Sequence, residues 1–351
     1  MSMIENLSFG MKLKLLVPTF MRSWGLVHTS HIVRLSIFGL AMLLFGFPVY
    51  AQDQYLLVSN REGRDVLRYN ADTGAFVDVF IPAETGGMNV PYGMTLGPDG
   101  NLYITSWATE IFPDNDPRVL KFDSHSGNYL GTFASDSAMS APADLAFGPD
   151  GNLYVADGSA NVFRFDGNTG ASMGVFASGD VGDSYRGLAW SPDGNLYVGT
   201  VSDHFDRFDG ATGVSLGILP ALQASSISNV AFGPDGLLYG GDYFGNSVYA
   251  YNFVTGELVK SFDGLSGAHG LTFDNNGELL VSSYFENQIV KFGSDSGSPG
   301  IVFTSGHPLN GPLDLVLLAV PEPSTYAMLL AGLGLLGFTA HRKKAAYTTN
   351  E

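Results

Sequence analysis

The chain has 351 residues, of which 45 are glycine, 15% are charged and 45% are hydrophobic. This composition favours a turn-rich all-β fold over a helical one. The formal net charge is −17, and residues 52–341 hold 10 Lys and Arg against 32 Asp and Glu, a net charge of −22. Such a field repels phosphate backbones, so nucleic-acid binding is not expected. The absence of cysteine excludes thiolate catalysis, cysteine-ligated metals and disulfides.

The N-terminal segment has the pattern of an export signal. An apolar run, LSIFGLAMLLFGFPV at residues 35–49, follows Arg34 and precedes Ala51, a small residue suited to the last position before a cleavage site. We predict a signal peptide over residues 1–51, cut between Ala51 and Gln52. The alternative is an uncleaved membrane anchor, although the run is shorter than the ~20 residues that a bilayer span requires.

One turn phrase recurs through the middle of the chain. It reads GPDGNLYI from Gly97, GPDGNLYV from Gly148, SPDGNLYV from Ser191, GPDGLLYG from Gly233 and DNNGELLV from Asp274. Proline sets φ at the second turn position and glycine accepts positive φ, so the phrase is typical of a β-hairpin. Repeats of roughly 40 to 50 residues with several short strands each indicate the blades of a β-propeller. The turn aspartates are expected to be structural, because none has the spacing of a calcium loop.

Each unit contains four short strands, and the third strand gives the blade count. Six third strands are expected, at residues 66–69, 119–122, 162–165, 205–208, 248–251 and 289–292. The first unit opens at Tyr55 with no preceding first strand, whereas residues 312–317 have the pattern of a first strand with nothing after it. We predict an all-β, six-bladed propeller of four-stranded blades over residues 52–319. The C-terminal strand would complete the opening blade and remove the free sheet edges.

The phrase PDGNLYV, with a Thr-Gly turn after the third strand, resembles the NHL-repeat, streptogramin-lyase-like and gluconolactonase-like propellers. The resemblance spans about residues 55–319. It implies the propeller fold but no single activity, because these families include lyases, lactonases, peptide binders and scaffolds.

First strands line the central channel in those families, so residues near the start of each first strand are expected at its mouth. Aligning the six units on the turn phrase gives one polar candidate per blade: Tyr92, Asp144, Arg186, Asn229, His269 and Asp314. Their oxygen and nitrogen atoms would suit a hydrated Ca²⁺ or Mg²⁺ ion or a polar ligand, although no metal site is assigned. The alternative is that these groups only hydrate the channel and cap strand ends.

His269 is the one candidate catalytic residue. The resemblance to streptogramin lyases implies a general base beside a bound Mg²⁺ or Ca²⁺, but residues 267–271 supply no carboxylate. The resemblance to lactonases implies an early glutamate as metal ligand, and none occurs at the channel entrance of the first blade. The sequence therefore favours a non-catalytic protein, with a divalent-metal-dependent lyase or lactonase as the alternative.

Aromatic residues gather in the loops that follow the second strands. They are Trp107, Tyr243, Phe244, Tyr284 and Phe285. Rings on one rim suit stacking on sugars or contact with peptides. The alternative is packing between the blades.

The C-terminus combines a proline-flanked tripeptide, an apolar run and a basic tail: Pro321, Glu322, Pro323, residues 326–339, Arg342, Lys343 and Lys344. The two prolines keep the tripeptide extended, as a protease substrate must be. The basic residues stay on the cytoplasmic side, which leaves the propeller outside. An ordinary stop-transfer helix is the alternative, although a run of ~14 residues is short for a permanent span.

This arrangement resembles the PEP-CTERM sorting signal, which we place at residues 320–344, ahead of a tail at residues 345–351. The resemblance implies a transmembrane helix recognised by an exosortase, a transpeptidase of Gram-negative bacteria that make exopolysaccharide, after export by the Sec machinery. We expect a monomer, transiently anchored in the inner membrane and destined for the cell surface or extracellular matrix. Its expected function is non-catalytic binding of extracellular polysaccharide or peptide, or a scaffold role.

Overall fold

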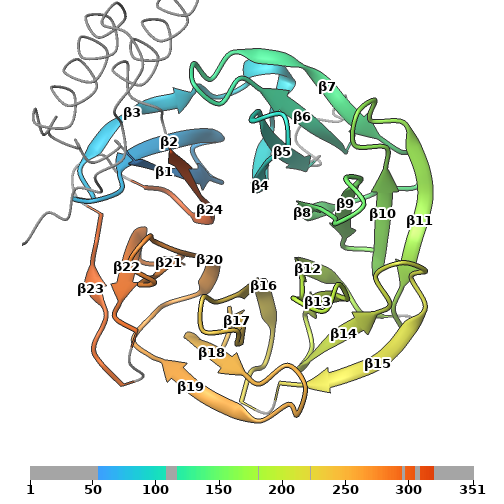
Figure 1. The fold of residues 1–351 in the computed structure, drawn as a ribbon. Coiled ribbons are helices and arrows are strands. Elements are labelled where there is room, and N and C mark those ends of the chain that lie inside the picture. Colours follow the sequence, from blue (N-terminus) through green and yellow to red (C-terminus); the bar gives the residue numbers. More distant parts are fainter. Residues whose placement is uncertain are drawn as a thin grey trace, which may run out of the picture. The chain divides into compact units, whose positions relative to one another are not determined.

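The computed structural model describes residues 54–107, 117–180, 182–221, 223–294, 297–304 and 309–319. The predicted signal peptide and sorting segment lie outside these residues. Across the described ranges, we find no helix with the length and apolar character that crossing a membrane demands. The described residues form six four-stranded antiparallel sheets around a common axis (Figure 1), which confirms the predicted six-bladed propeller.

Five blades take their four strands in chain order, from the innermost to the outermost. Blade two contains β4 (Val90–Leu96), β5 (Leu102–Trp107), β6 (Arg118–Phe122) and β7 (Tyr129–Ser135). Blade three contains β8 (Pro142–Phe147), β9 (Leu153–Asp157), β10 (Asn161–Phe165) and β11 (Ser172–Ser178). Blade four contains β12 (Tyr185–Trp190), β13 (Leu196–Thr200), β14 (His204–Phe208) and β15 (Ser215–Pro220). Blade five contains β16 (Ile227–Phe232), β17 (Leu238–Asp242), β18 (Ser247–Tyr251) and β19 (Leu258–Phe262). Blade six contains β20 (Ala268–Phe273), β21 (Leu279–Ser283), β22 (Gln288–Phe292) and β23 (Ile301–Val302).

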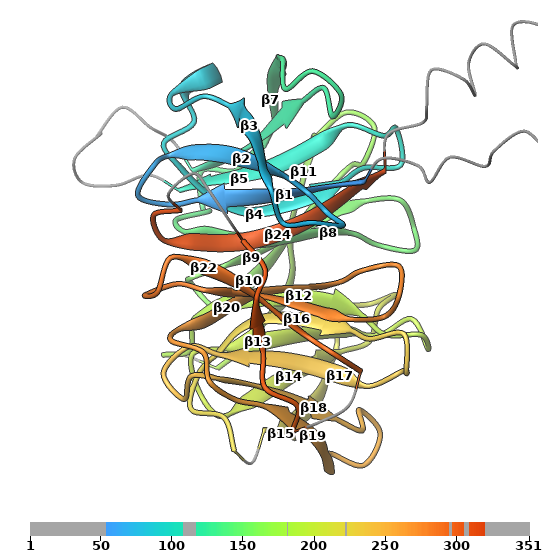
Figure 2. The ribbon, with the colours of Figure 1, turned by 90° about the vertical axis from the view of Figure 1, so that its left-hand side faces the viewer.

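Blade one closes the ring with strands from both ends of the described chain. Its order is β24 (Pro312–Ala319), β1 (Gln54–Asn60), β2 (Asp65–Asn70) and β3 (Phe76–Ile81), and the 3₁₀ turn η1 (Thr85–Gly87) leads on to blade two. Figure 2 shows β24 beside β1, with Gln54 opposite Ala319 and Asn60 opposite Pro312. The predicted closure by a C-terminal strand is therefore confirmed, and the pairing satisfies the inner edge of β1.

The aspartates of the turn phrase accept hydrogen bonds within their own hairpins. In blade two, Asp99 accepts the backbone N–H of Asn101 at 3.1 Å and the hydroxyl of Tyr103 at 3.1 Å. Asp150 and Asp235 accept the equivalent amide and tyrosine hydroxyl in blades three and five. These carboxylates therefore hold the beginning of the second strand against the turn, as expected for structural turn residues.

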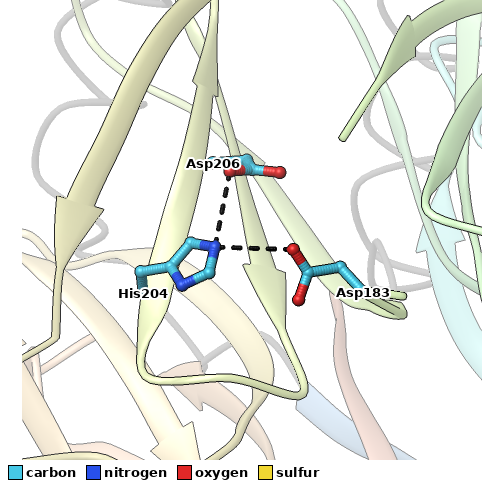
Figure 3. A group of neighbouring side chains, drawn as sticks. All are labelled: Asp183, His204 and Asp206. Carbon is cyan, nitrogen blue, oxygen red and sulfur yellow. Dashed lines mark ion pairs between the residues drawn. The ribbon is translucent and has the colours of Figure 1, made fainter. Parts of the chain in front are cut away.

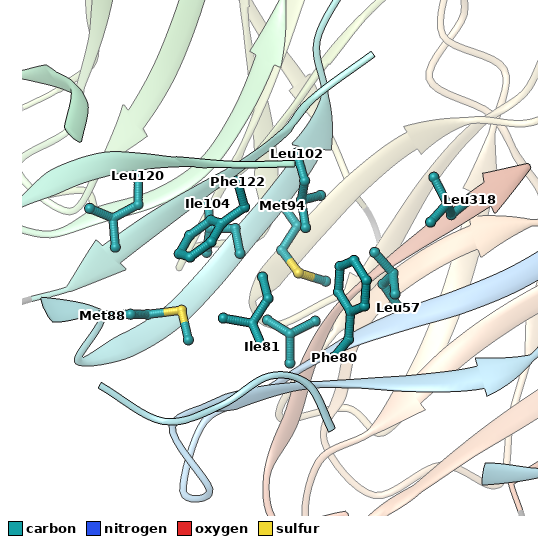
Figure 4. Close-up of a cluster of buried hydrophobic side chains, with 11 residues drawn as sticks. Leu57, Phe80, Ile81, Met88, Met94, Leu102, Ile104, Leu120, Phe122 and Leu318 are labelled. Carbon is teal, nitrogen blue, oxygen red and sulfur yellow. The ribbon is translucent and has the colours of Figure 1, made fainter. Parts of the chain in front are cut away.

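The hydrophobic core lies between neighbouring blades rather than within a single one. Figure 4 shows the cluster between blades one and two, which includes Leu57, Ile81, Met94, Ile104 and Phe122, all buried. Full burial of a Leu or Phe side chain contributes about 1.5 to 3 kcal/mol each. Because each sheet buries both faces against its neighbours, the second strands consist of nearly unbroken apolar runs.

Candidate functional site

The innermost strands share a register break near the rim where they begin. The pairing with the second strand shifts between Pro91 and Met94 in blade two, between Pro142 and Leu145 in blade three, and at matching positions in the other blades. A bulge of this kind leaves local amides outside the ladder and re-aims side chains. The six predicted channel residues stand at two successive positions of these strands and therefore form two layers.

The inner layer alternates glycine with an acidic or amide side chain around the axis: Gly93, Asp144, Gly187, Asn229, Gly270 and Asp314. Each glycine lies against the Asx residue of the following blade. A Cβ placed on Gly93 would be 2.7 Å from the Cα of Asp144, and one on Gly187 would be 2.5 Å from the Cα of Asn229. Neighbouring blades can therefore approach closely because one residue of each facing pair has no side chain.

The carboxylates of this layer bind backbone amides. Asp314 accepts the N–H of Met94 in blade two at 2.7 Å, and Asp144 accepts the N–H of Leu188 in blade four at 3.0 Å. Burial raises the pKa of Asp314 to about 7. Burial, and then the negative charge of Asp314, raises the pKa of Asp144 well above its ordinary value. These groups tie adjacent blades together at the bulges, as Asx caps do elsewhere.

The outer layer opens into a cavity of about 200 Å³ at the rim, which we call the mouth pocket. Three of the predicted channel residues, Tyr92, Arg186 and His269, line it, whereas Asp144, Asn229 and Asp314 do not. The aromatic loop residues Trp107, Tyr243, Phe244 and Tyr284 line it as well. The structure thus brings half of the predicted channel residues together with four of the five predicted rim aromatics.

His269 is held by Tyr92. The Tyr92 hydroxyl and the Nε2 atom of His269 are 2.9 Å apart, within hydrogen-bond distance, and the positive charge of Arg186 acts on the Tyr92 hydroxyl. The Nδ1 atom of His269 is buried and has no hydrogen-bond partner among the described residues.

The environment of His269 keeps the imidazole neutral. Burial, and then the positive charges of Arg186 and Arg61, lower its pKa to about 3. The charged groups that act on it within the described part of the chain are both cations. A divalent metal beside this imidazole would add two further positive charges to those of Arg186 and Arg61, and no described carboxylate acts on the ring to offset them.

Arg186 is one of two cations that line the mouth pocket, and it is half-buried. Its guanidinium carbon lies 5.4 Å from the centre of the Trp107 ring. Among the residues that the structure describes, no carboxylate lies within ion-pair distance of Arg186. Arg61, in contrast, pairs with Glu62 at 3.4 Å and donates a hydrogen bond to the Tyr284 hydroxyl at 2.8 Å. The pocket therefore holds one guanidinium without an acidic partner, in a span with a net charge of −22.

Aromatic rings form one wall of the pocket. Tyr243 packs edge-on against His269, with ring centres 6.0 Å apart, and lies 5.7 Å from Tyr284. The side chains of Phe244 and Phe285 are 68% and 57% exposed. The predicted rim aromatics of blades five and six therefore pack against one another and also present rings to solvent, whereas Trp107 packs against Tyr92 in blade two.

Sequence reasoning missed Arg61, which lines the pocket from the loop after β1. The signal was available, because Arg61 follows the second strand of blade one, as the rim aromatics follow the second strands of other blades. The predicted channel alignment treated only first strands. The second strand of a blade runs antiparallel to the first, so it ends at the rim where the first strand begins. Loops that follow second strands therefore reach the same mouth.

Comparison with known proteins identifies the C-terminal segment. Residues 319–343 match the family described as PEP-CTERM protein-sorting motif. The chain carries a PEP-CTERM sorting motif. The motif implies export, membrane-anchored sorting in a Gram-negative bacterium and exosortase-dependent processing. No curated protein matches the chain significantly.

Solved structures share the propeller fold at low sequence identity. A chain of a nidogen/laminin complex is 16% identical, with a TM-score of 0.62, and the match covers 76% of this chain and 98% of that one. A protein of unknown function from Bacteroides caccae is 14% identical, with a TM-score of 0.58 and coverage of 76% and 100%. A catalytically inactive virginiamycin B lyase from Staphylococcus aureus with quinupristin is 15% identical, with a TM-score of 0.50 and coverage of 75% and 78%. These likenesses establish the fold.

Proposed function

We propose that this PEP-CTERM protein is a non-catalytic, surface-displayed propeller that binds an acidic sugar unit of extracellular polysaccharide in the mouth pocket. The observation that carries the proposal is Arg186, a guanidinium without an acidic partner among the described residues, stacked on Trp107. An arginine fork binds carboxylates with two parallel hydrogen bonds, and it keeps that capacity while stacked on a ring. The aromatic wall offers faces for the apolar side of a sugar ring.

The size of the pocket supports a small ligand. Its volume of about 200 Å³ falls below the range of roughly 300 to 1,000 Å³ that holds drug-sized molecules. One pyranose unit suits such a space, with the rest of a polymer running over the rim past Phe244, which is 68% exposed. His269 acts here as a positioning residue, because it lies within hydrogen-bond distance of Tyr92 in the wall of the pocket.

The direction of the chain supports display of the pocket. Ala319, the first residue of the sorting motif, pairs with Gln54 at one end of the closing blade. Arg61 lies at the other end of β1 and lines the pocket. The chain therefore leaves the ring on the face opposite the pocket, so that a tail held at the membrane would leave the pocket facing outward. In this proposal the signal peptide covers residues 1–51 and the exported propeller residues 52–319.

The metal-dependent lyase or lactonase alternative has less support. A general base works best when its pKa lies near the operating pH, and that of His269 is about 3. The carboxylates of the inner layer bind backbone amides of neighbouring blades. Structures of this fold include both a nidogen/laminin complex and a lyase with quinupristin, so the fold alone does not separate binding from catalysis.

Binding of galacturonate oligomers to the full-length chain, measured by calorimetry, tests the proposal. The methyl esters of the same oligomers remove the charge and keep the sugar ring, so they should bind far more weakly. Arg186→Met should weaken uronate binding about 10- to 100-fold, the range for losing one hydrogen bond to a charged group. Arg207→Met removes the same charge from the same blade at a site outside the pocket and should leave binding unchanged. Equal affinity for acid and ester would refute the proposal.

A further inference from the structure

A second group of polar side chains lies in blade four, outside the mouth pocket. Figure 3 shows Asp183, His204 and Asp206, which we call the His204 cluster. His204 and Asp206 project from the same face of β14 because they are two residues apart on a strand, and Asp183 comes from the segment between β11 and β12. Their facing atoms lie within 4.8 Å of one another.

The spacing within the cluster suits a shared ion better than direct hydrogen bonds. Nε2 of His204 lies 3.7 Å from Oδ2 of Asp183 and 3.6 Å from Oδ1 of Asp206. Both distances are longer than a hydrogen bond. Two ligands of a tetrahedral zinc ion, each ~2.0 to 2.1 Å from the metal, stand about 3.4 Å apart. The imidazole nitrogen therefore lies within a few tenths of an ångström of the spacing that a shared ion would set with each carboxylate.

Each residue of the cluster is oriented through its other polar atom. Ser202 donates its hydroxyl to Oδ1 of Asp183 at 2.8 Å, and Tyr185 donates its hydroxyl to Oδ2 of Asp206. Nδ1 of His204 lies 3.6 Å from a carboxylate oxygen of Asp203. Carboxylates that face the far nitrogen of a ligating histidine, and hydroxyls that hold ligating carboxylates, are the usual outer shell of a metal site.

Asp206 supplies an independent reason for a cation. The residue is only 8% exposed, yet its Oδ1 atom accepts no hydrogen bond from the described residues and faces His204. An ion bound between Oδ1 and the imidazole would balance the carboxylate charge in this largely buried setting.

We propose that the His204 cluster is a binding site for a divalent transition-metal ion of the Zn²⁺ type. One imidazole nitrogen with two carboxylate oxygens suits Zn²⁺ and its first-row neighbours, whereas Ca²⁺ and Mg²⁺ prefer oxygen alone. Three protein ligands leave a fourth position for water. The ion would link the segment that enters blade four to β14, close to the rim that carries the mouth pocket.

Metal analysis of the untagged full-length chain tests this site. The chain is stripped with a chelator, equilibrated with Zn²⁺ and dialysed, and one zinc ion per chain is expected. Zn²⁺ at about 100 times its Kd should raise the Tm by roughly 5 to 10 °C, whereas Ca²⁺ should not. Co²⁺ in place of Zn²⁺ should give the visible absorption bands of a four-coordinate ion.

Variants separate the cluster from chance binding. His204→Gln and Asp183→Asn, which keep the side-chain shapes, should each abolish stoichiometric zinc. Ser202→Ala should weaken zinc binding about 10- to 100-fold, as loss of an outer-shell partner does. His125→Gln removes an imidazole from an exposed turn in blade two and should retain the ion. The proposal would be overturned if the wild type retained no zinc after dialysis while its circular dichroism spectrum showed the native fold. Full zinc content in His204→Gln would overturn it as well.

Discussion

Gly270→Ala tests the close approach of blades six and one at the ring closure. A Cβ on Gly270 would lie 2.1 Å from the carbonyl oxygen of Leu313 and 2.7 Å from the Cα of Asp314. Both atoms belong to the backbone of β24, which is paired with β1 along its length. Ordinary contact begins at 3.4 Å, so β24 and β20 would have to separate by about 1.3 Å.

The expected result is a large loss of stability. Overpacking a close-packed site costs about 1 to 3 kcal/mol, and the upper end applies because the obstacle is backbone rather than a mobile side chain. The φ of residue 270 lies outside the left-handed region, so steric contact with β24 is the cause. For a domain of this size, a loss of about 3 kcal/mol lowers the Tm by roughly 6 to 12 °C. Thermal unfolding followed by circular dichroism measures the shift.

Gly293→Ala provides the matched control. Nothing lies within 4 Å of a Cβ at that position, and its φ is also outside the left-handed region. Alanine there should be neutral or stabilise the fold by up to about 1 kcal/mol, because it restricts the unfolded chain. If the two variants unfold at the same temperature, the argument that glycine permits the approach of adjacent blades is wrong.

Three further predictions address the inner layer and the tail. Because the folded-state pKa of Asp314, about 7, exceeds its ordinary value, its contribution to stability is complete below about pH 4 and is lost as the pH rises toward 7. In Asp314→Asn, the unfolding free energy from denaturant titrations should fall less between about pH 4 and 7 than it does in the wild type. Parallel pH profiles of the two proteins would contradict this. Ser282→Ala should cost about 1 to 3 kcal/mol in the same assay, because Ser282 Oγ accepts the buried N–H of Gly270 at 2.8 Å, whereas the exposed Ser215→Ala should cost little. Alanines at residues 321–323 should leave the precursor unprocessed in a host with an exosortase, and normal processing on immunoblots would exclude the sorting role.

The blade count could be predicted from the sequence because the turn phrase is local. Proline, aspartate and glycine in fixed order specify a hairpin wherever they occur, so each repeat marks one blade. The unmatched strand at residues 312–317 predicted the closing pair with β1, because a sheet edge without a partner is costly. Neither inference required knowledge of which residues meet in space.

The candidate site could be predicted only in part. Aligning first strands placed Tyr92, Arg186 and His269 at the mouth, as the structure does. The same alignment offered Asp144 and Asp314, which stand one position further along their strands and lie in a separate layer, where they bind amides of adjacent blades. A single-strand pattern does not reveal which of two successive positions faces the pocket.

By itself, the sequence determined the six-bladed ring, its closing strand and the PEP-CTERM tail, because each rests on short contiguous signals. Only the tertiary structure decided that Arg186 stacks on Trp107 without an acidic partner among the described residues, and that Asp183 meets His204 across blade four. These contacts join residues from different strands and loops, and the folded backbone alone sets their distances. The physical reason is that hairpin chemistry acts over a few residues, whereas a binding site needs side chains converging from several elements.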